Sequence, residues 1–393
     1  MTMSDHDVAV VGVGQSEFGA LEGQRVTEFG GRAVREALLA SNVDNDGIEE
    51  AYIGNVASAA QDQTGVVGQA VLREVGVTGI PITRVENACA SSTCAFREAY
   101  RTVRSGECDV VLALGVEKMT GVPTDVALKD MSGASDAEVE GPMGMTFMGV
   151  YGMRANAYMD RFGDVREELA DIAVKNHSNG LANPYAHLHL DVGREDVLDS
   201  RMVADPIRLL DACPMSDGAA AAVLARGEVA EKLTDEPVYV DAVEASSGDY
   251  LDSDLEYWRE ELDERVSERA YREAGIGPDD LDVVEVHDAA TIGELMHYEG
   301  LGLASHGEGA SLVRNGDVLL DGRIPVNPSG GLKSRGHPVG ATGIAQVCEL
   351  VWQLRGEAGD RQVNDPTIGL AQNSGGALVG EGGVSTVTIL STR

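Results

Sequence analysis

This 393-residue chain contains few lysines and no long apolar run, and each of these features argues against a class of protein. Only five lysines occur, and the basic residues number 30 against 65 acidic ones, for a formal net charge of −35. A nucleic acid is therefore not expected as a partner, because neutralising phosphates requires a cationic surface. No run of about 18 apolar residues occurs, so we expect no membrane-spanning helix and no membrane as a partner.

Cysteine is also sparse and irregularly spaced. The five cysteines show no CxxC spacing, so we expect neither a zinc site nor a disulfide framework, and a reducing cytoplasm fits this usage. The first residues lack the basic and apolar parts of a signal peptide, which also favours a cytoplasmic location. His187 and His189 form an HxH pair. Because lone surface histidines are commoner than ligands, we predict no metal site.

The chain has enough apolar residues for a sizeable core. Hydrophobic residues make up 43% of it and the mean hydropathy is −0.11, which argues against global disorder. Acidity combined with such a core is best interpreted as a surface adapted to high salt, because dense carboxylates stay hydrated and are screened at molar salt. We therefore expect a salt-rich cytosol, as in haloarchaea.

Strands and helices alternate in a way that predicts an α/β fold with two similar halves. In the first half a turn bearing Cys89 begins a helix over 90–103, and a strand follows at 110–114. In the second half a Gly-rich turn bearing His337 begins a helix, and a strand follows at 368–371. This repetition indicates duplication of one unit. A pseudo-twofold arrangement would bring Cys89 and His337 to a single site.

Residue chemistry supports a reactive site at these two turns. Cys89 stands at the beginning of a helix, where free backbone amides and the helix dipole favour a thiolate. The alternative, a small buried hydrophobic cysteine, stays open. A histidine in a Gly-rich turn suits proton transfer, although such turns are often only turns. The methionine-rich segment 121–201 resembles a lobe that covers the site with an adaptable apolar wall, and a plain methionine-rich core is the alternative.

Four motifs, in this order, resemble the thiolase superfamily over essentially the whole chain. They are Val85-Glu-Asn-Ala-Cys-Ala-Ser-Ser, Ser216-Asp-Gly-Ala-Ala-Ala, Asn327-Pro-Ser-Gly-Gly and Gly336-His-Pro-Val-Gly-Ala-Thr-Gly. The sequence Glu285-Val-His-Asp is similar to archaeal and sterol-carrier-type thiolases.

The resemblance implies a thiolase fold, with two duplicated βαβαβαββ halves in α/β/α/β/α layers and an inserted loop domain. The N-terminal half would comprise 1–120 and 202–236, the loop domain 121–201, and the C-terminal half 237–393.

The resemblance also implies roles for individual residues. Cys89 would be the nucleophile, His337 would activate its thiol, and His287 would polarise a thioester carbonyl. The other residues that it implies are Gly375, Asn373 and Asn327 for the oxyanion hole and positioning, with the Cys89 and Gly375 amides as donors, and Ser247, Met145 and Gly376 for substrate binding. No cofactor is implied, since coenzyme A thioesters are the substrates.

This chain departs from the family pattern at the second catalytic cysteine. Many thiolases carry that cysteine where this chain has Asn373, and sterol-carrier-type relatives place one where it has Ala289. An amide side chain does not titrate, so Asn373 can only position other groups. The proton transfers would then pass to His287 or His337, as in ketosynthases.

The expected function is that of an acetyl-CoA C-acetyltransferase or acyltransferase that forms or cleaves acetoacetyl-CoA or another 3-ketoacyl-CoA. Mevalonate synthesis, polyester synthesis and β-oxidation are all candidate pathways. A non-catalytic acyl-CoA or lipid-carrier subunit and a ketosynthase-like condensing enzyme are alternatives. The resemblance further implies a homodimer or homotetramer, and a zinc-ribbon/OB-fold partner that bridges in some cases to hydroxymethylglutaryl-CoA synthase.

The acidic surface leads to a first prediction. The melting temperature should rise between about 0.1 M and 2 M KCl, because the screening length falls from roughly 10 Å to below 3 Å and the repulsion among surface carboxylates weakens. Thermal unfolding followed by circular dichroism measures this change. A melting temperature that stays constant or falls over this range would contradict the adaptation to salt.

Overall fold

The computed structural model describes residues 7–56, 64–123, 126, 131–250 and 255–392, and its main element is a nine-stranded mixed sheet. The strand order is β3 (Ile82–Val85), β2 (Glu50–Gly54), β4 (Val110–Glu117), β7 (Gly218–Arg226), β1 (Val8–Gln15), β8 (Val238–Ser247), β11 (Glu381–Ser391), β10 (Ile368–Leu378) and β9 (Val283–Glu285). Strands β1 and β8 share only two residue pairs, Ala9 with Tyr239 and Val10 with Val238. At this junction the sheet divides into an N-terminal and a C-terminal part.

The two parts of the sheet repeat one topology. In the first, β2 lies parallel to β3 and β4, and β7 is antiparallel to β4 and β1. In the second, β9 lies parallel to β10, and β11 is antiparallel to β10 and β8. The counterpart of β3 is a single parallel bridge between Val284 and Val326. The predicted duplication is confirmed, with one strand of the second half reduced to this bridge.

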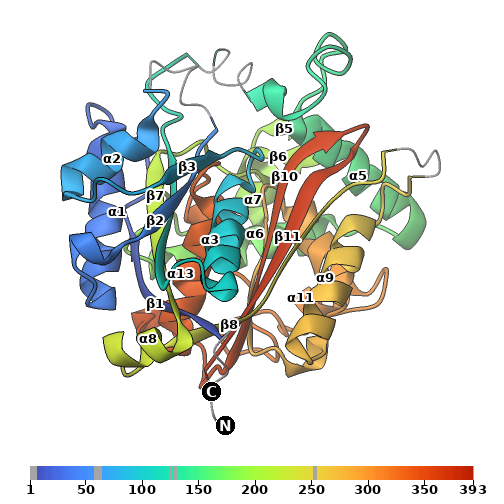
Figure 1. The fold of residues 1–393 in the computed structure, drawn as a ribbon. Helices are drawn as coiled ribbons and strands as arrows, with labels where there is room; N and C mark the ends of the chain where they lie inside the picture. The colour runs from blue at the N-terminus through green and yellow to red at the C-terminus, as the bar shows by residue number, and fades with distance from the viewer. Residues whose placement is uncertain (1–6, 57–63, 124–125, 127–130, 251–254, 393) are drawn as a thin grey trace.

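Helices separate the two parts of the sheet and cover both outer faces (Figure 1). Helices α3 (Ser91–Ser105) and α13 (Thr342–Leu354) lie between them, and Phe96 and Val347 share one core with strands of both parts. The outer faces are covered by α1 (Val26–Ser41) and α2 (Val67–Val75) on the N-terminal part, and by α9 (Glu261–Ala274) and α10 (Thr291–Gly300) on the C-terminal part. This arrangement is the predicted α/β/α/β/α layering.

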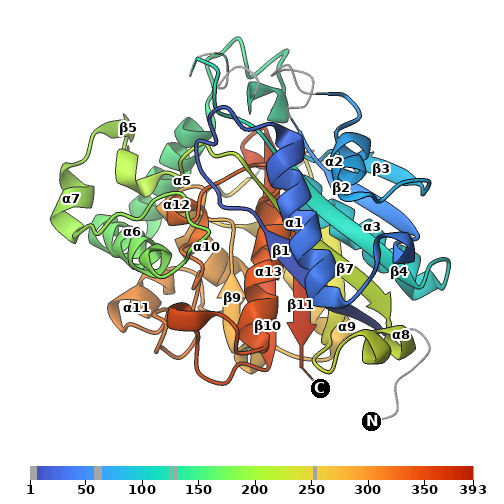
Figure 2. The ribbon, with the colours of Figure 1, turned by 90° about the vertical axis from the view of Figure 1, so that its left-hand side faces the viewer.

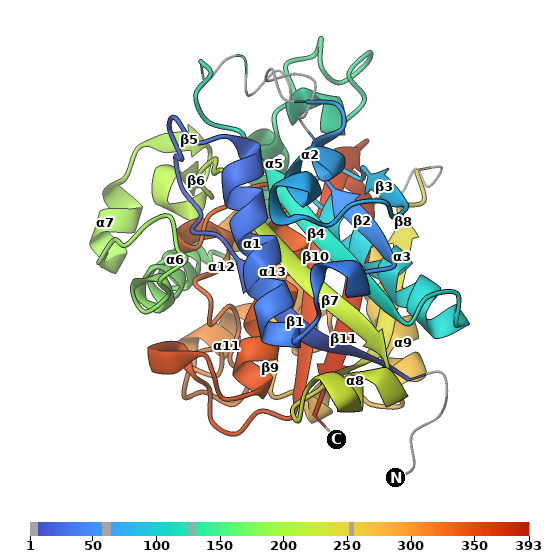
Figure 3. The same ribbon diagram turned by 60° about the vertical axis from the view of Figure 1, so that its left-hand side comes forward.

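The chain between β4 and β7 forms a separate lobe. It contains α5 (Phe147–Phe162), α6 (Arg166–Leu181), α7 (Arg194–Asp199) and a two-stranded sheet of β5 (Met202–Ala204) and β6 (Ile207–Arg208). Helices α6 and α7 stand on the side away from α2 and β3 (Figures 2 and 3). Tyr158 and Ile172 of this lobe join the core of the C-terminal half. The predicted domain boundaries remain a prediction.

Three further α-helices of the described residues are short. They are α8 (Gly227–Leu233), α11 (Gly309–Arg314) and α12 (Gly331–Ser334). Within the described residues, no helix combines the length and the apolar character that crossing a membrane requires.

Two buried ion pairs join the end of β9 to α12 and the residue after it. The Arg335 guanidinium lies 3.1 Å from the Glu285 carboxylate, and the Lys333 ammonium lies 3.7 Å from that of Asp288. All four side chains are at most 1% exposed. Ser329 also donates to Glu285 at 2.7 Å. A charge buried in this way is costly without its partner, so the two segments are held in one relative position.

The Glu285–Arg335 pair leads to a prediction for stability. Arg335→Met should lower the free energy of unfolding by about 3–5 kcal/mol, because the buried Glu285 carboxylate loses its cation. The double variant with Glu285→Gln should recover part of this loss, since the unpaired charge is removed. Chemical denaturation measures both values.

Arg166→Met is the matched control, since it removes the exposed Arg166–Asp164 pair, and exposed pairs contribute about 0–1 kcal/mol. If Arg335→Met cost no more than this control, the buried pair would not hold the segments together.

Candidate active site

Cys89 lies in a tight turn between β3 and α3. Ala88 has φ +48°, an uncommon value for a residue other than glycine. The Ser91 hydroxyl donates to the Ala88 carbonyl at 2.6 Å and accepts from the Asn87 amide at 2.8 Å. These bonds fix the turn and leave the Cys89 side chain half-buried at the beginning of the helix.

His337 is buried in the turn before α13, and its ring orientation is fixed by Thr342. Its Nδ1 lies 2.7 Å from the Thr342 hydroxyl, which in turn donates to the Pro338 carbonyl at 3.0 Å. Because the hydroxyl proton is used by Pro338, Nδ1 carries the proton that the hydroxyl accepts. Nε2 is then an unprotonated acceptor, as a general base requires.

His287 is held in the opposite tautomer. Its backbone amide donates to Gln372 at 3.0 Å, and its Nδ1 lies 3.4 Å from the side-chain nitrogen of Asn373. Gln346 fixes the Asn373 amide, since its Nε2 donates to the Gln372 carbonyl and its Oε1 accepts from Asn373 at 3.0 Å. Nδ1 of His287 is therefore an acceptor, and Nε2 carries a proton that can be donated to a ligand.

The structure brings Cys89, His287 and His337 together, as the sequence predicts. One side-chain atom from each lies within 4.8 Å of the others, and the two imidazole rings stand edge to face with centroids 5.0 Å apart. The site thus has a thiol, an imidazole acceptor and an imidazole donor in contact range. Their spacing would also allow the three to hold a metal ion.

Burial keeps all three groups uncharged. Burial lowers the pKa of His337 to about 3, with a smaller effect from Arg335. The pKa of His287 is lowered well below its usual value, first by burial and then by His337. Burial raises the pKa of Cys89 to about 12, followed by the effect of Cys213, and the Gly376 amide only partly opposes this. The prediction of a resting thiolate at Cys89 is therefore wrong, because desolvation outweighs the backbone amides.

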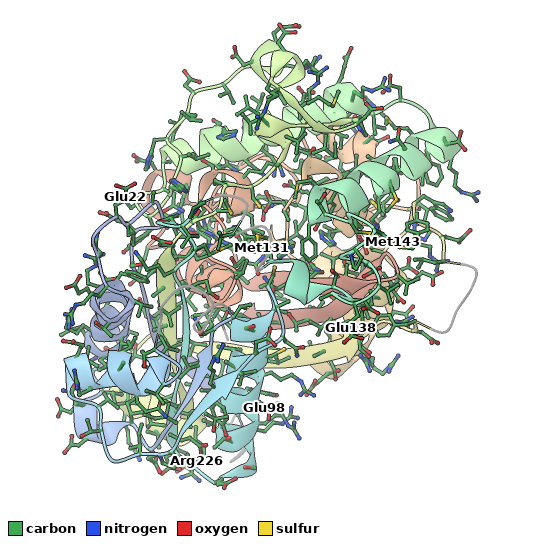
Figure 4. All side chains as sticks on the ribbon, turned by 90° about the horizontal axis from the view of Figure 1, so that it is seen from above. Glu22, Glu98, Met131, Glu138, Met143 and Arg226 are labelled. Carbon is green, nitrogen blue, oxygen red and sulfur yellow. The ribbon has the colours of Figure 1, made fainter. Side chains whose placement is uncertain are left out.

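An apolar cavity of about 350 Å³ opens onto His337. Methionines form much of its wall, and the lining includes Met119, Met131, Met145, Met148, Phe147 and Val150. Met145 was predicted to contact substrate, and it does line this cavity. Figure 4 shows Met131 over the centre of the molecule, whereas Met143 lies farther out and is 80% exposed. Only part of the methionine-rich lobe therefore forms the wall.

Two glycines of β10 lie against the Cys89 turn. A Cβ at Gly375 would come within 2.3 Å of the Asn87 carbonyl and 2.7 Å of the Ala90 amide, so no side chain fits there. The backbone amide of Gly376 donates to the Cys89 sulfur. The amides that reach this sulfur are those of Gly376 and of Cys89 itself, whereas Gly375 allows the two backbones to approach each other.

Asn327 positions the chain but directs neither polar atom to the thiol. Its side-chain oxygen accepts from the Val286 amide at 2.9 Å, and its nitrogen donates to Glu294 at 2.9 Å. These bonds hold the backbone just before His287. Asn327 is therefore a positioning residue in this structure, and the oxyanion part of its predicted role finds no support in these contacts.

Ser247 lies apart from the cavity that His337 lines, and its role in substrate binding stays a prediction. Ser247 is exposed at the end of β8. It lines a different groove, together with Val85, Cys94 and Val384. Ser247 pairs with Val384 in the antiparallel ladder of β8 and β11.

The HxH pair binds protein atoms. His187 Nδ1 lies 2.9 Å from the Ser216 hydroxyl, and His189 Nε2 lies 3.0 Å from the Asn183 carbonyl.

Three residues of the site were not predicted from the sequence. Thr342 and Gln346 lie on α13, at positions one turn apart that face His337 and Asn373. Helical spacing from the Gly-rich turn could have indicated both. Cys213 lines the cavity together with His337, but nothing in its local sequence signals this tertiary position.

The raised pKa of Cys89 leads to a prediction for its reactivity. Its alkylation by iodoacetamide should keep rising about tenfold per pH unit from about pH 7 to pH 9, because only the thiolate reacts. Peptide mass spectrometry measures the rate at Cys89 separately from the other cysteines. A rate that levels off near pH 7 would indicate a resting thiolate and contradict this account.

Comparisons with known proteins support the resemblance to thiolases. The chain matches the model of the thiolase N-terminal domain over residues 8–228 and that of the thiolase C-terminal domain-like family over residues 253–392. It is 43% identical to the acetyl-CoA acetyltransferase of Methanothermobacter thermautotrophicus, over 98% of this chain and 99% of that protein. It is 35% identical to bovine sterol carrier protein 2, over 97% of this chain and 72% of that protein.

A solved structure extends the likeness to the fold. The Ltp2-ChsH2(DUF35) aldolase superposes with a TM-score of 0.83, at 22% identity, over 100% of this chain and 99% of the other. At that identity the match bears on the fold alone. Two thiolase domain models in sequence order, together with the relatives at 43% and 35% identity, establish the family: the chain belongs to the thiolases.

Proposed function

We propose that the protein is an acetyl-CoA C-acetyltransferase or acyltransferase, which forms or cleaves acetoacetyl-CoA or another 3-ketoacyl-CoA. One observation carries this proposal: a thiol, an imidazole acceptor and an imidazole donor lie within 4.8 Å of one another, beside an apolar cavity of about 350 Å³. The names of the relatives support the choice of acetyl-CoA as a substrate. The apolar lining favours an uncharged acyl group.

The first half of the reaction is acyl transfer to Cys89. Nε2 of His337 takes the thiol proton, and the Cys89 sulfur attacks the thioester carbonyl of the acyl-CoA. A carbon–sulfur bond to Cys89 forms, and the bond to the sulfur of coenzyme A breaks. Backbone amides at Cys89 and at Gly375 or Gly376 are the proposed donors to the developing oxyanion, each worth about 2.7–4 kcal/mol.

The second half is the Claisen condensation. A base of the site takes a proton from the methyl group of acetyl-CoA, and the methyl carbon attacks the acyl group on Cys89. Nε2–H of His287 donates to the acetyl-CoA carbonyl, where enolate charge develops. Cys89 leaves as a thiolate and recovers its proton from His337. Asn373 holds the tautomer of His287 and transfers no proton itself.

The three-residue cluster also discriminates among the alternatives. A non-catalytic acyl-CoA or lipid carrier needs a cavity but has no use for two neutral histidines held in opposite tautomers beside a thiol. A ketosynthase-like enzyme would use the same three groups. It would differ in its second substrate, which the CoA-dependence of the reaction tests.

The proposal also covers the oligomeric state of the protein, its cellular environment and its partner proteins. We infer a homodimer or homotetramer in a salt-rich cytoplasm, serving mevalonate synthesis or another pathway that uses acetoacetyl-CoA. A zinc-ribbon/OB-fold partner and hydroxymethylglutaryl-CoA synthase are the proposed associates. The name of one fold neighbour includes a DUF35 component, which makes a partner protein worth testing for this chain.

Substitution of the three side chains tests the proposed function. Cys89→Ala should abolish activity, because no acyl-enzyme can form, and His287→Ala and His337→Ala should each lower kcat by about 10²–10⁴-fold. The measurement is the CoA-dependent loss of acetoacetyl-CoA absorbance in molar KCl, with candidate partner added and acylation of Cys89 followed by mass spectrometry. Cys108→Ala, at a half-buried cysteine near Glu50, is the control. Activity retained by Cys89→Ala would exclude Cys89 as the nucleophile.

A further inference from the structure

The proposed reaction requires a proton carrier that the three-residue cluster does not readily supply. A proton must reach the sulfur of the departing coenzyme A, and another must leave the methyl group of acetyl-CoA. His337 already holds the proton of Cys89, and His287 is fixed as a donor by Asn373. A fourth group that can both give and take a proton would complete the site.

Cys213 occupies a suitable place. It is half-buried, carries a free thiol and lines the same apolar cavity as His337. It lies close enough to Cys89 to affect the ionisation of that thiol. Burial raises the pKa of Cys213 itself to about 12, and Lys333 opposes this only in part. Its resting state is therefore the thiol, which is the form able to donate a proton.

Backbone pairing fixes Cys213 between the two catalytic histidines. Its amide donates to the Ala289 carbonyl at 3.0 Å, two residues after His287. Met215, two residues further on, pairs with His337 in a parallel bridge. The short segment that carries Cys213 therefore touches the backbone of both histidine-bearing turns. Pro214 follows directly and restricts this part of the chain.

We propose that Cys213 is the second thiol of this enzyme, the acid and base that the Asn373 and Ala289 positions do not provide. This inference rests on the proposed function. In acyl transfer, Cys213 gives its proton to the sulfur of the departing coenzyme A and becomes a thiolate, while His337 holds the proton of Cys89. In condensation, the Cys213 thiolate takes the proton from the methyl group of acetyl-CoA. Cys89, released as the carbon–carbon bond forms, recovers its proton from His337.

Thiols suit both transfers. A thiol and the sulfur of coenzyme A are the same chemical group, and burial in one apolar cavity raises the pKa of both. Proton exchange between them is therefore nearly balanced in energy, as efficient acid–base catalysis requires. The apolar lining of the cavity excludes water, which would otherwise compete for the proton. All atoms and charges are restored at the end of the cycle, and no oxidant or further reactant is needed.

The test separates proton abstraction from acyl-enzyme formation. Wild type, Cys213→Ala, Cys213→Ser and the control Cys108→Ala are each given acetyl-CoA in D₂O. Mass spectrometry then follows acetylation of Cys89, and NMR follows deuterium entry into the methyl group of acetyl-CoA. Cys213→Ala and Cys213→Ser should acetylate Cys89 more slowly than wild type, because the departing sulfur of coenzyme A loses its proton donor, but the acetylated enzyme should still form on longer incubation. Once Cys89 is acetylated, deuterium entry and condensation in both variants should be lower than in wild type by about 10²–10⁴-fold, while Cys108→Ala matches wild type.

The experiment distinguishes failure of the proposed function from failure of the role proposed for Cys213. If wild type neither acetylates Cys89 nor condenses acetyl-CoA, the proposed function fails. If wild type does both and either Cys213 variant keeps deuterium entry within about threefold, the role of Cys213 is overturned and a histidine is the base. Two variants guard against misfolding, and acetylation of Cys89 in each reports an intact site. A disulfide between Cys89 and Cys213 in untreated protein, reversed by reductant, would independently support their proximity.

Discussion

The site depends on the two buried ion pairs that join the His287 segment to the His337 segment. Glu285 and Asp288 flank His287, and their cations, Arg335 and Lys333, precede His337 by two and four residues. A buried ion pair adds little net stability over apolar packing. Here the two ion pairs fix the relative position of the two turns, because each of the four buried charges finds its partner in only one arrangement. The distance between the imidazoles follows from that arrangement.

Hydrogen bonds then determine which histidine accepts a proton from its ligand and which donates one. Thr342 holds the proton of His337 on Nδ1, whereas Gln346 and Asn373 hold the proton of His287 on Nε2. One ring therefore faces its ligand as an acceptor and the other as a donor. Asn373 stands where the resemblance to thiolases implies a thiol, and here its amide fixes the tautomer of His287. This difference explains how a non-titrating residue contributes to the site.

Much of this could be predicted from the sequence, because the decisive patterns are local. Cys89 and His337 each follow a tight turn and begin a helix, and the repeated order of elements places them across a pseudo-twofold axis. The groove that a strand end lines depends on tertiary packing, so the sequence could not show that Ser247 lies apart from the cavity of His337. The ionisation of Cys89 was misjudged because its burial depends on tertiary packing, such as that of β10 against the Cys89 turn, which is far away in sequence. Cys213 was missed because only tertiary pairing brings it beside Ala289.

The neutral resting state of the site fits the charge of the whole chain. A protein with net charge −35 repels anionic coenzyme A thioesters, and a resting thiolate would add to that repulsion beside the reacting carbonyl. With the pKa of Cys89 at about 12 and that of His337 at about 3, neither group is charged before substrate arrives. Proton transfer from Cys89 to His337 is then favourable only as the substrate carbonyl accepts the negative charge. Burial thus couples ionisation of the thiol to the presence of its substrate.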